Sequence, residues 1–411
     1  MSISGLLAAA GEAEAILADA DALMRIDSSN PPGDCAPVAA AAEALLRRVP
    51  GARVWRADHD AANANVVGLL ENGAGPSLML NGHLDTYGIG EAAAWTVPPL
   101  AATVRGPYLF GRGAADMKGG IAAMLAAFRA LARHRGLWRG RLVLALVADE
   151  ESMGVRGTQH LLRTVPECRA DACLVADAGS PRVARFGEKG MLWIGLTATG
   201  RAAHGAHVHL GDNAATRLIE AVRRVQALAG MPVAADPAII AAVRAAAGVS
   251  EAEAGAGETE TLLGVTVNLG TISGGRLRNL VADQARAELD LRLPMGLSTA
   301  ALERAVRAAV AGVRAIAVTV QVAWEPTATP PDAPIVQAVL EAGTEVLGRK
   351  PVATMRVGAS DARLTRAAGI PTVVYGPAPR NMGAPDEHVA IADLIAVAQV
   401  HALAAVRMLG G

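Results

Sequence analysis

The chain has 411 residues, of which 52% are hydrophobic and 19% are charged, so it can bury the cores of two or three domains. Its formal net charge of -1 gives no electrostatic reason to expect nucleic acid or an anionic membrane as a partner. Its three cysteines lack CxxC spacing, which argues against a disulfide framework and a thiolate zinc site and favours a reducing, cytoplasmic location. No basic segment precedes the apolar N-terminus and no membrane-length apolar run follows, so we expect neither a signal peptide nor a membrane span.

The first part of the chain alternates helical and strand-like segments. Apolar residues recur at helical spacing over residues 1–25 and 36–48, on either side of a Ser-Ser-Asn-Pro-Pro-Gly break. Short apolar runs predict strands at 65–70, 77–80, 142–148 and 172–176, and a helix is expected at 119–133. Strands that are apolar along their whole length are typical of a parallel or mixed sheet with helices on both faces.

The middle of the chain predicts a different sheet. In residues 285–293 apolar and charged side chains alternate, which is typical of a strand with one face in water. Further strands are expected at 191–199, 265–269 and 316–322, and helices at 213–228, 237–247 and 299–312. Residues 246–260 are rich in Ala, Glu and Gly, and we expect them to form a surface excursion.

The last part of the chain returns to the first pattern, with a helix expected at 360–368 and a strand at 371–375. We therefore predict an α/β domain, residues 1–187 and 327–411, whose mixed, mostly parallel sheet is covered by helices. Residues 188–326 are predicted to form an α+β domain inserted between these two parts.

A histidine and an aspartate follow the apolar strand at 77–80. His83 and Asp85 point the same way if the strand continues, because side chains alternate with a period of two. The carboxyl ends of strands in open α/β sheets form the edge where ligands bind. A metal-binding histidine usually has its other ring nitrogen held by a carboxylate or a carbonyl, a role that fits Asp85 or any nearby carbonyl. Alone, the pair is equally compatible with a structural or surface role.

Asp116 lies in a glycine-rich loop, residues 111–120, ahead of an apolar helix. The loop has neither the Walker nor the dinucleotide-binding spacing, so phosphate binding is the weaker interpretation. Two roles for Asp116 stay open on these grounds: the cap of the following helix, or a carboxylate that bridges two cations.

Acids also follow the next two strands: residues 149–151 are Asp-Glu-Glu, and Asp177 follows the strand at 172–176. Acids gathered at strand ends are costly unless a cation or water neutralises them, although a solvated turn also accommodates them. Of two adjacent carboxylates, one can ligate a metal while the other takes a proton from metal-bound water. His, Asp and Glu at four successive strand or loop ends therefore favour a zinc-type hydrolytic site. The sequence has no GxSxG nucleophile elbow.

In order and over nearly the whole chain, these motifs resemble the M20 metallopeptidase/deacylase family, which includes acetylornithine deacetylase, succinyl-diaminopimelate desuccinylase, aminoacylase and glutamate carboxypeptidase. The resemblance implies that the inserted domain is a lid or dimerisation domain. It implies one metal held by His83, Asp116 and Asp177 and a second served by Glu151. It also implies that Asp85 is the partner of His83 and that Glu150 is the general base.

The resemblance extends to the inserted domain and to the last part of the chain. His204, in a glycine-flanked loop, resembles the lid histidine that reaches the partner subunit's active site and stabilises the oxyanion; His207 and His209 are close rivals. Asn279, Arg292 and Ser360 resemble residues at or near the substrate, with Arg292 binding a carboxylate. Spacing alone favours a surface histidine and a solvent-facing strand arginine. The implied partners are a second copy of the chain and a small amide substrate with a carboxylate.

One position departs from the family pattern. The last metal ligand is expected to be a histidine four residues before Glu387, where this chain has Gly383. Either His388 is the ligand through a shifted loop, which we favour, or the second metal site is weakened and the enzyme uses one metal or another group there.

The resulting hypothesis is a metal-dependent hydrolase that cleaves an amide bond of an N-acyl amino acid or small peptide-like substrate, with Glu150 as base to metal-activated water. The expected cofactor is Zn²⁺, one or two ions per chain, with Co²⁺ or Mn²⁺ as substitutes. Two alternatives stay open. One is a hydrolase of a carbamoyl or other non-peptide C–N bond, and the other is a non-catalytic ligand-binding relative with a degraded second metal site.

Overall fold

The apolar runs of the first and last parts of the chain come together in one nine-stranded sheet in the computed structural model, which describes residues 2–410. Its strands lie in the order β1 (Arg53–Arg56), β2 (Val66–Asn72), β6 (Gly140–Val147), β3 (Ser77–His83), β7 (Ala172–Val175), β15 (Thr372–Val374), β8 (Val183–Glu188) and β13 (Thr327–Ala328), and β14 (Val352–Arg356) pairs with β8. Strands β6, β3 and β7 are parallel neighbours, so their carboxyl ends open on one edge of the sheet.

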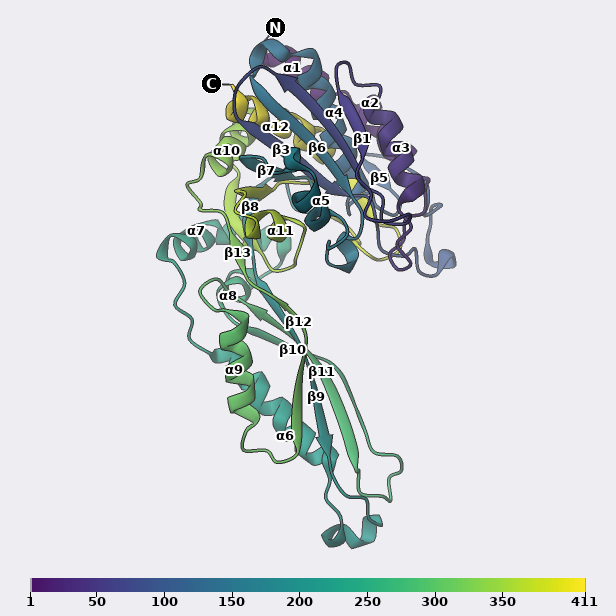
Figure 1. Ribbon diagram of the computed structural model, residues 1–411, viewed down its shortest axis with the longest axis vertical. Coiled ribbons are helices and arrows are strands. Elements are labelled where there is room, and N and C mark those ends of the chain that lie inside the picture. Colours follow the sequence, from purple (N-terminus) through teal and green to yellow (C-terminus); the bar gives the residue numbers. More distant parts are fainter. Residues whose placement is uncertain (1, 411) are drawn as a thin grey trace.

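Helices cover this sheet because their apolar stripes need a partner surface. Helices α4 (Lys118–Arg133) and α12 (Ile391–Leu409) pack on β3 and β6. Three further helices pack on these two: α1 (Ile3–Ala10), α2 (Ala13–Met24) and α10 (Pro334–Leu347). Helix α3 (Ala36–Leu46) contacts β1 and β2, while α5 (Thr158–Thr164) packs against α11 (Ala362–Ala367). The sheet and its helices form the upper body in Figure 1, where both ends of the chain lie. The predicted α/β architecture with a mixed sheet is confirmed.

The N-terminal segment differs in detail from the prediction. Instead of one helix over residues 1–25, the structure has α1 (Ile3–Ala10) and α2 (Ala13–Met24), because the chain breaks at Gly11. Of the helices described in residues 2–410, α12 alone is long and apolar enough to cross a membrane by length and composition, with a mean hydropathy of 1.5. It packs on α4 and α10 with its apolar side chains in the core, as a core helix does.

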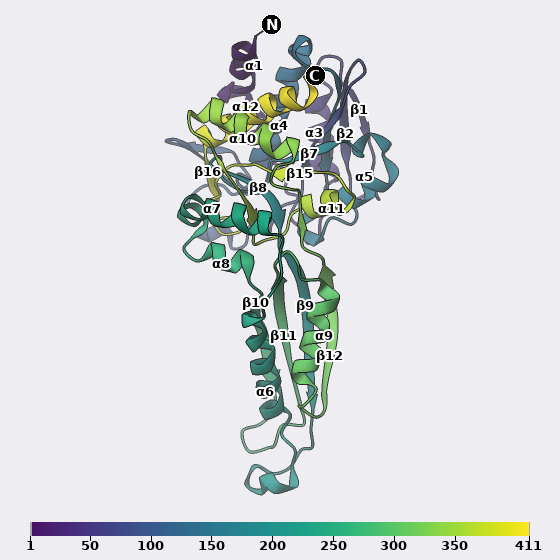
Figure 2. The same cartoon turned by 90° about the vertical axis from the view of Figure 1, so that its left-hand side faces the viewer.

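The inserted domain is an antiparallel four-stranded sheet with the order β10 (Thr266–Gly274), β11 (Gln284–Leu293), β9 (Gly190–Thr199) and β12 (Ile316–Trp324). The apolar side chains of β11 face helices α6 (Ala214–Gln226) and α9 (Thr299–Val310), and its charged side chains face outward, as the alternation predicts. Figure 2 shows this sheet and its two helices as an elongated arm below the body. We call this arm the lid.

The chain leaves the lid between α6 and β10 and returns to the body. There α7 (Pro237–Ala254) packs on β14, and α8 (Glu258–Leu263) packs on α7. The buried Glu258 carboxylate accepts hydrogen bonds from Arg185 Nη1 at 3.1 Å and from the Ser250 hydroxyl. The expected surface excursion at 246–260 is confirmed in part: residues 252–257 are exposed, but the segment is helical on both sides of this turn and Ser250 and Glu258 anchor it to the body. The predicted domain limits at 188 and 326 stay a prediction.

Helix α12 carries a histidine that folding removes completely from water. His401 Nε2–H donates to the Tyr375 carbonyl at 2.7 Å, and Nδ1 has no hydrogen-bond partner within residues 2–410. Burial lowers the pKa of His401 to about 4 from its ordinary value of 6.5. Between these two pH values the unfolded chain binds a proton that the folded chain does not, so the free energy of unfolding falls as the pH falls.

Replacing this histidine should remove that part of the acid sensitivity. As the pH falls from 7 to 4, we expect the free energy of unfolding of the wild type to decrease by about 3 kcal/mol more than that of His401→Gln, because Gln does not titrate. Urea unfolding at a series of pH values measures the difference, and the same substitution at the exposed His209 serves as the control. Parallel pH profiles for wild type and His401→Gln would show that the buried histidine is not the acid-sensitive group.

Candidate metal centre

His83 ends β3 and is held by the turn that follows it. Its Nδ1 lies 2.9 Å from the Asp85 carbonyl oxygen and 3.6 Å from the Asp85 carboxylate. A carbonyl only accepts, so Nδ1 carries a proton and Nε2 is the ring nitrogen that a metal ion can take once Nε2 has lost its own proton. Nε2 lies 3.0 Å from Asp116 Oδ1. Burial lowers the pKa of His83, but hydrogen bonds with Asp116 and Asp85 outweigh it and raise that pKa well above its usual value.

The Asp85 carboxylate holds the loop that carries the paired glutamates. It accepts the backbone N–H groups of Glu150 at 3.2 Å and Glu151 at 3.0 Å, and the Asn30 side-chain amide at 2.9 Å. These hydrogen bonds stabilise a fully buried negative charge. Asp85 therefore positions two elements at once: its carbonyl orients His83, and its carboxylate fixes the turn after β6.

Glu387 holds the glycine-rich loop that carries Asp116. Its Oε1 accepts the backbone N–H groups of Gly113 at 3.0 Å, Ala115 at 2.9 Å and Asp116 at 3.3 Å, while its Oε2 pairs with the buried Arg112. Burial raises the pKa of Glu387, and the Ala115 N–H and the Arg112 guanidinium oppose this rise. The sequence marks Glu387 only as a landmark near Gly383, and the structure shows that it positions Asp116.

Glu150 and Glu151 form a short turn after β6, behind Asp149, which has a positive φ of 73°. Burial, reinforced by neighbouring acids, raises the pKa of Glu150 well above its usual value. Burial and Asp116 together raise the pKa of Glu151 to about 8. Within residues 2–410, the buried Glu151 Oε1 has no hydrogen-bond partner. A buried carboxylate oxygen without a donor is costly, and a cation is the group that compensates for it.

His83, Asp116 and Glu151 each place one ligand atom within 4.8 Å of the others. One imidazole nitrogen and two carboxylate oxygens form a donor set that zinc readily accepts. Together with the unpartnered Glu151 oxygen, this set fits a divalent metal ion.

Asp177 follows β7 at the same edge but makes different contacts. Its Oδ2 accepts a hydrogen bond from Arg356 Nη1 at 2.6 Å, and its Oδ1 accepts the Ala178 N–H. Burial raises the pKa of Asp177, and the Arg356 guanidinium opposes this rise. Burial lowers the pKa of Arg356, but Asp177, Glu188 and Asp116 outweigh it and hold that pKa above its usual value. No sequence motif singles out Arg356, because its role depends on β14 lying near β7.

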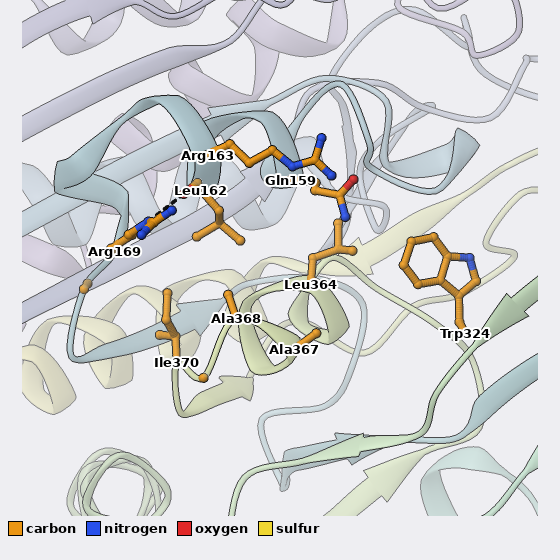
Figure 3. Close-up of a pocket in the computed structure, with 11 residues that line it drawn as sticks. Gln159, Leu162, Arg163, Arg169, Trp324, Leu364, Ala367, Ala368 and Ile370 are labelled. Atoms are coloured by element: carbon orange, nitrogen blue, oxygen red, sulfur yellow. Dashed lines mark hydrogen bonds between the residues drawn. The ribbon is translucent and has the colours of Figure 1, made fainter. Parts of the chain in front are cut away.

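A cavity of about 330 Å³ opens beside these groups, between the body and the start of the lid. Its lining residues are Tyr87, Asp116, Glu150, Glu151, Met153, Asp177, Met191, Trp193, Arg292, Arg356, Gly358, Ala359 and Met382. A larger cavity of about 560 Å³ lies between α5, α11 and the end of β12 (Figure 3). None of the 11 residues that line the larger cavity is an acid or a histidine, so the smaller cavity is the candidate active site.

The predicted lid residues divide between two places. Arg292 lines the acid-rich cavity, where its guanidinium is bonded to Asp290 at 2.8 to 3.1 Å. His204 and Asn279 do not line that cavity. They lie together in the lid, where Gly205 N–H donates to the Asn279 carbonyl and the His204 backbone pairs with Leu280. The loop that follows β9 lies at the far end of the lid from the body (Figure 2).

Two predicted site residues make contacts outside the cavity. His388 begins β16 (His388–Ala390), which pairs with β5 (Tyr108–Phe110); its ring stacks on Phe110 at 4.3 Å, and its Nδ1 faces the Asp386 carbonyl. The candidate metal-binding group within residues 2–410 does not contain it, so the role of His388 as a ligand stays a prediction without support from this geometry. Ser360 is fully buried and its hydroxyl donates to Glu188, so it is not exposed to substrate; Gly358 and Ala359 line the cavity instead.

The histidine expected at position 383 is replaced by a glycine that the loop conformation favours. Gly383 has a φ of 75°, a left-handed backbone conformation that residues other than glycine rarely adopt. A Cβ atom at this position would lie 3.6 Å from the ring of Tyr87, and the Gly383 carbonyl accepts a hydrogen bond from Arg112 at 3.2 Å. The loop therefore contributes backbone contacts rather than a metal ligand.

Comparison with known proteins gives consistent similarities. The profile of peptidase family M20/M25/M40 matches residues 79–407. The succinyl-diaminopimelate desuccinylase of Rhodospirillum centenum is 32% identical over 336 residues, which cover 80% of this chain and 80% of that enzyme. The M20 family metallo-carboxypeptidase Sso-CP2 from Sulfolobus solfataricus has a similar fold, with a TM-score of 0.76 at 18% identity over 94% of this chain and 97% of that chain. The Bacillus subtilis YXEP protein, a dinuclear metal-binding M20 peptidase, gives a TM-score of 0.65 at 15% identity over 96% of this chain and 99% of that chain.

Removing the charge of Glu387 should loosen the loop that carries Asp116. We expect Glu387→Gln to weaken zinc binding by about 10- to 100-fold, the usual effect of losing a group that orients a metal ligand. Competition with a chromophoric chelator measures the affinity. Glu341→Gln, which alters an exposed ion pair with Arg407, is the control. Equal zinc affinity in Glu387→Gln and the wild type would mean that Asp116 is held by other contacts.

Proposed function

The chain belongs to peptidase family M20/M25/M40, whose members are metal-dependent hydrolases of N-acyl amino acids and peptides, and from this premise we propose a substrate and roles for its residues. We propose that it hydrolyses the amide bond of an N-acyl amino acid or a small peptide-like molecule. The observation that carries this proposal is the cavity beside His83, Asp116 and Glu151, because Glu150 lines the same cavity as Asp116 and Glu151, two of the residues that would hold the metal.

The walls of the cavity support a substrate with a carboxylate. Arg292 and Arg356 both line it, and Trp193 adds an indole Nε1–H that is buried and has no partner among residues 2–410. A carboxylate or an amide carbonyl of the substrate can accept a hydrogen bond from that indole. Relatives named succinyl-diaminopimelate desuccinylases suggest a dicarboxylic acyl group as the first class to test.

The metal is proposed to be zinc, held by His83, Asp116 and Glu151. When bound, such an ion supplies Lewis-acid polarisation of the scissile carbonyl and lowers the pKa of water. The protein supplies the orientation. The Asp85 carbonyl fixes the ring of His83, and Glu387 holds the backbone around Asp116.

Glu150 is proposed as the general base. It is mostly buried, it lines the cavity, and the Arg363 guanidinium lies 3.8 Å from its carboxylate. Burial favours the protonated form of the carboxyl and raises its pKa, so the Glu150 carboxylate is a stronger base for the proton of the attacking water. It then passes this proton to the leaving amine, which must be protonated for the C–N bond to break.

His204 is proposed to stabilise the developing oxyanion from a second copy of the chain. It lies in the lid and does not line the cavity of its own subunit. A homodimer joined through the lids is therefore proposed, in which each cavity receives the His204 loop of the partner. The outward face of the lid sheet, with exposed residues along β10, is available for this contact.

The role of Glu150 leads to a first prediction. Glu150→Gln should lower kcat by about 10²- to 10⁴-fold, because the amide cannot accept a proton. Its zinc affinity should stay within about threefold of the wild type, because Glu150 is not a ligand. Rates of hydrolysis of N-succinyl and N-acetyl amino acids, dipeptides and carbamoyl compounds test both the role and the substrate class. Full activity in zinc-loaded Glu150→Gln would exclude the proposed base, and no turnover of any substrate by the zinc-loaded wild type would favour a ligand-binding protein.

The exchanged histidine leads to a second prediction. His204→Ala and Glu150→Gln should each be nearly inactive, but the two chains expressed together should recover about a quarter of the wild-type rate, because mixed dimers contain one intact site. The rate of each variant expressed alone is the baseline. The matched control mixture contains His209→Ala in place of His204→Ala, together with Glu150→Gln. Failure of the first mixture to exceed its baseline, with mixed dimers shown to be present, would mean that His204 acts within its own subunit or not at all.

A further inference from the structure

Arg356 holds a carboxylate at the edge of the metal-binding group. It ends β14, and its Nη1 lies 2.6 Å from Asp177 Oδ2. The other oxygen of Asp177 accepts the backbone N–H of Ala178. Both side chains are buried, with 14% of Arg356 and 5% of Asp177 exposed. The two oxygens of Asp177 are thus already engaged, in contrast to Glu151, whose Oε1 has no donor among the described residues.

The guanidinium also contributes a fixed positive charge to this edge of the sheet. Asp177 is bonded to it directly, and Glu188 and Asp116 also stabilise its charge, so it compensates for carboxylates that a second cation would otherwise neutralise. A guanidinium keeps its charge in proteins at all ordinary pH values. A divalent ion bound next to Asp177 would face this positive charge at short range and would be repelled by it.

The remaining ligands are enough for one ion and too few for two. His83, Asp116 and Glu151 are the one group of three or more candidate ligands that comes together within residues 2–410. Three protein ligands and one open position are the usual coordination of a catalytic zinc. Within residues 2–410 no second group of three ligands comes together for another ion, since position 383 is a glycine and His388 stacks on Phe110.

We propose that this chain binds a single catalytic divalent ion through His83, Asp116 and Glu151, and that Arg356 supplies the positive charge of the second ion of a dinuclear site. Asp177 then serves as the anchor of Arg356 rather than as a metal ligand. This inference deepens the proposed hydrolase and rests on it for the presence of a metal. It separates this chain from the Bacillus subtilis relative of similar fold, which is a dinuclear metal-binding peptidase.

The first test is the number of zinc ions bound by the full chain. Metal-free wild type is titrated with Zn²⁺ by calorimetry, and metal content is measured after gel filtration. One equivalent per chain is expected. Two equivalents of similar affinity would overturn the inference, and fewer than half an equivalent would overturn it together with the metal site itself.

The second test asks whether Arg356 excludes the second ion. Arg356→Met frees Asp177 and should bind a second equivalent of zinc, whereas the matched variant Arg356→Lys keeps a positive charge and should stay at one. Circular dichroism verifies that both variants are folded. If folded Arg356→Met stays at one equivalent, Arg356 does not replace an ion.

A third pair of variants keeps the inference testable if Arg356→Met does not fold. Asp177→Asn should bind one equivalent with an affinity within about threefold of the wild type, whereas Glu151→Gln should lose at least about tenfold, because only Glu151 is a ligand. Equal losses in the two variants would show that Asp177 ligates the metal and would overturn the inference. Amide turnover distinguishes the two proposals: two bound ions with turnover reject only the single-ion site, and one bound ion without turnover rejects only the hydrolase.

Discussion

The structure depends on how it compensates for negative charge at one edge of the central sheet. The turns after β3, β6 and β7 bring Asp85, Glu150, Glu151 and Asp177 there, and the glycine-rich loop adds Asp116. Buried carboxylates are stable only when donors or cations surround them. Backbone N–H groups satisfy Asp85 and Glu387, and arginines satisfy Asp177 and Glu387. Glu151 keeps an oxygen without a donor among residues 2–410, and Glu150 has only Arg363 at 3.8 Å; these two carboxylates have the most direct proposed roles in metal binding and proton transfer.

This division of charge explains why the supporting residues are as important as the ligands. Glu387 and Asp85 are far apart in the sequence, yet each accepts several N–H groups from a loop that carries a reactive side chain. Such contacts hold the loops in one conformation before metal and substrate arrive, which lowers the cost of reorganisation when charge develops. The buried pairing of Arg112 with Glu387 ties the C-terminal part of the chain to the loop that precedes α4.

The second organising feature is the insertion of the lid at the same edge. The chain passes from β8, in the central sheet, directly into β9, in the lid sheet. Met191 and Trp193 at the start of β9 therefore line the cavity, while the other end of β9 extends away from the body (Figure 1). The site is therefore composite even within one subunit, since Arg292 approaches it from the lid. Helices α7 and α8 return to the body through the buried contact of Glu258 with Arg185 and fix the base of the lid.

The sequence by itself determined the parts of this protein that depend on local pattern. The alternation of apolar and charged residues in 285–293 predicted β11 and its solvent-exposed face. Unbroken apolar runs predicted β3, β6 and β7, because the spacing of apolar residues follows from which faces of a strand are buried. It also placed His83, Asp116, Glu150 and Glu151 near one another, because parallel strands end at one edge. Only the tertiary structure decided which long-range partner each group meets. Asp177 meets Arg356 from β14, Ser360 is covered by Glu188, and His388 stacks on Phe110, since each contact joins segments whose proximity no local pattern encodes.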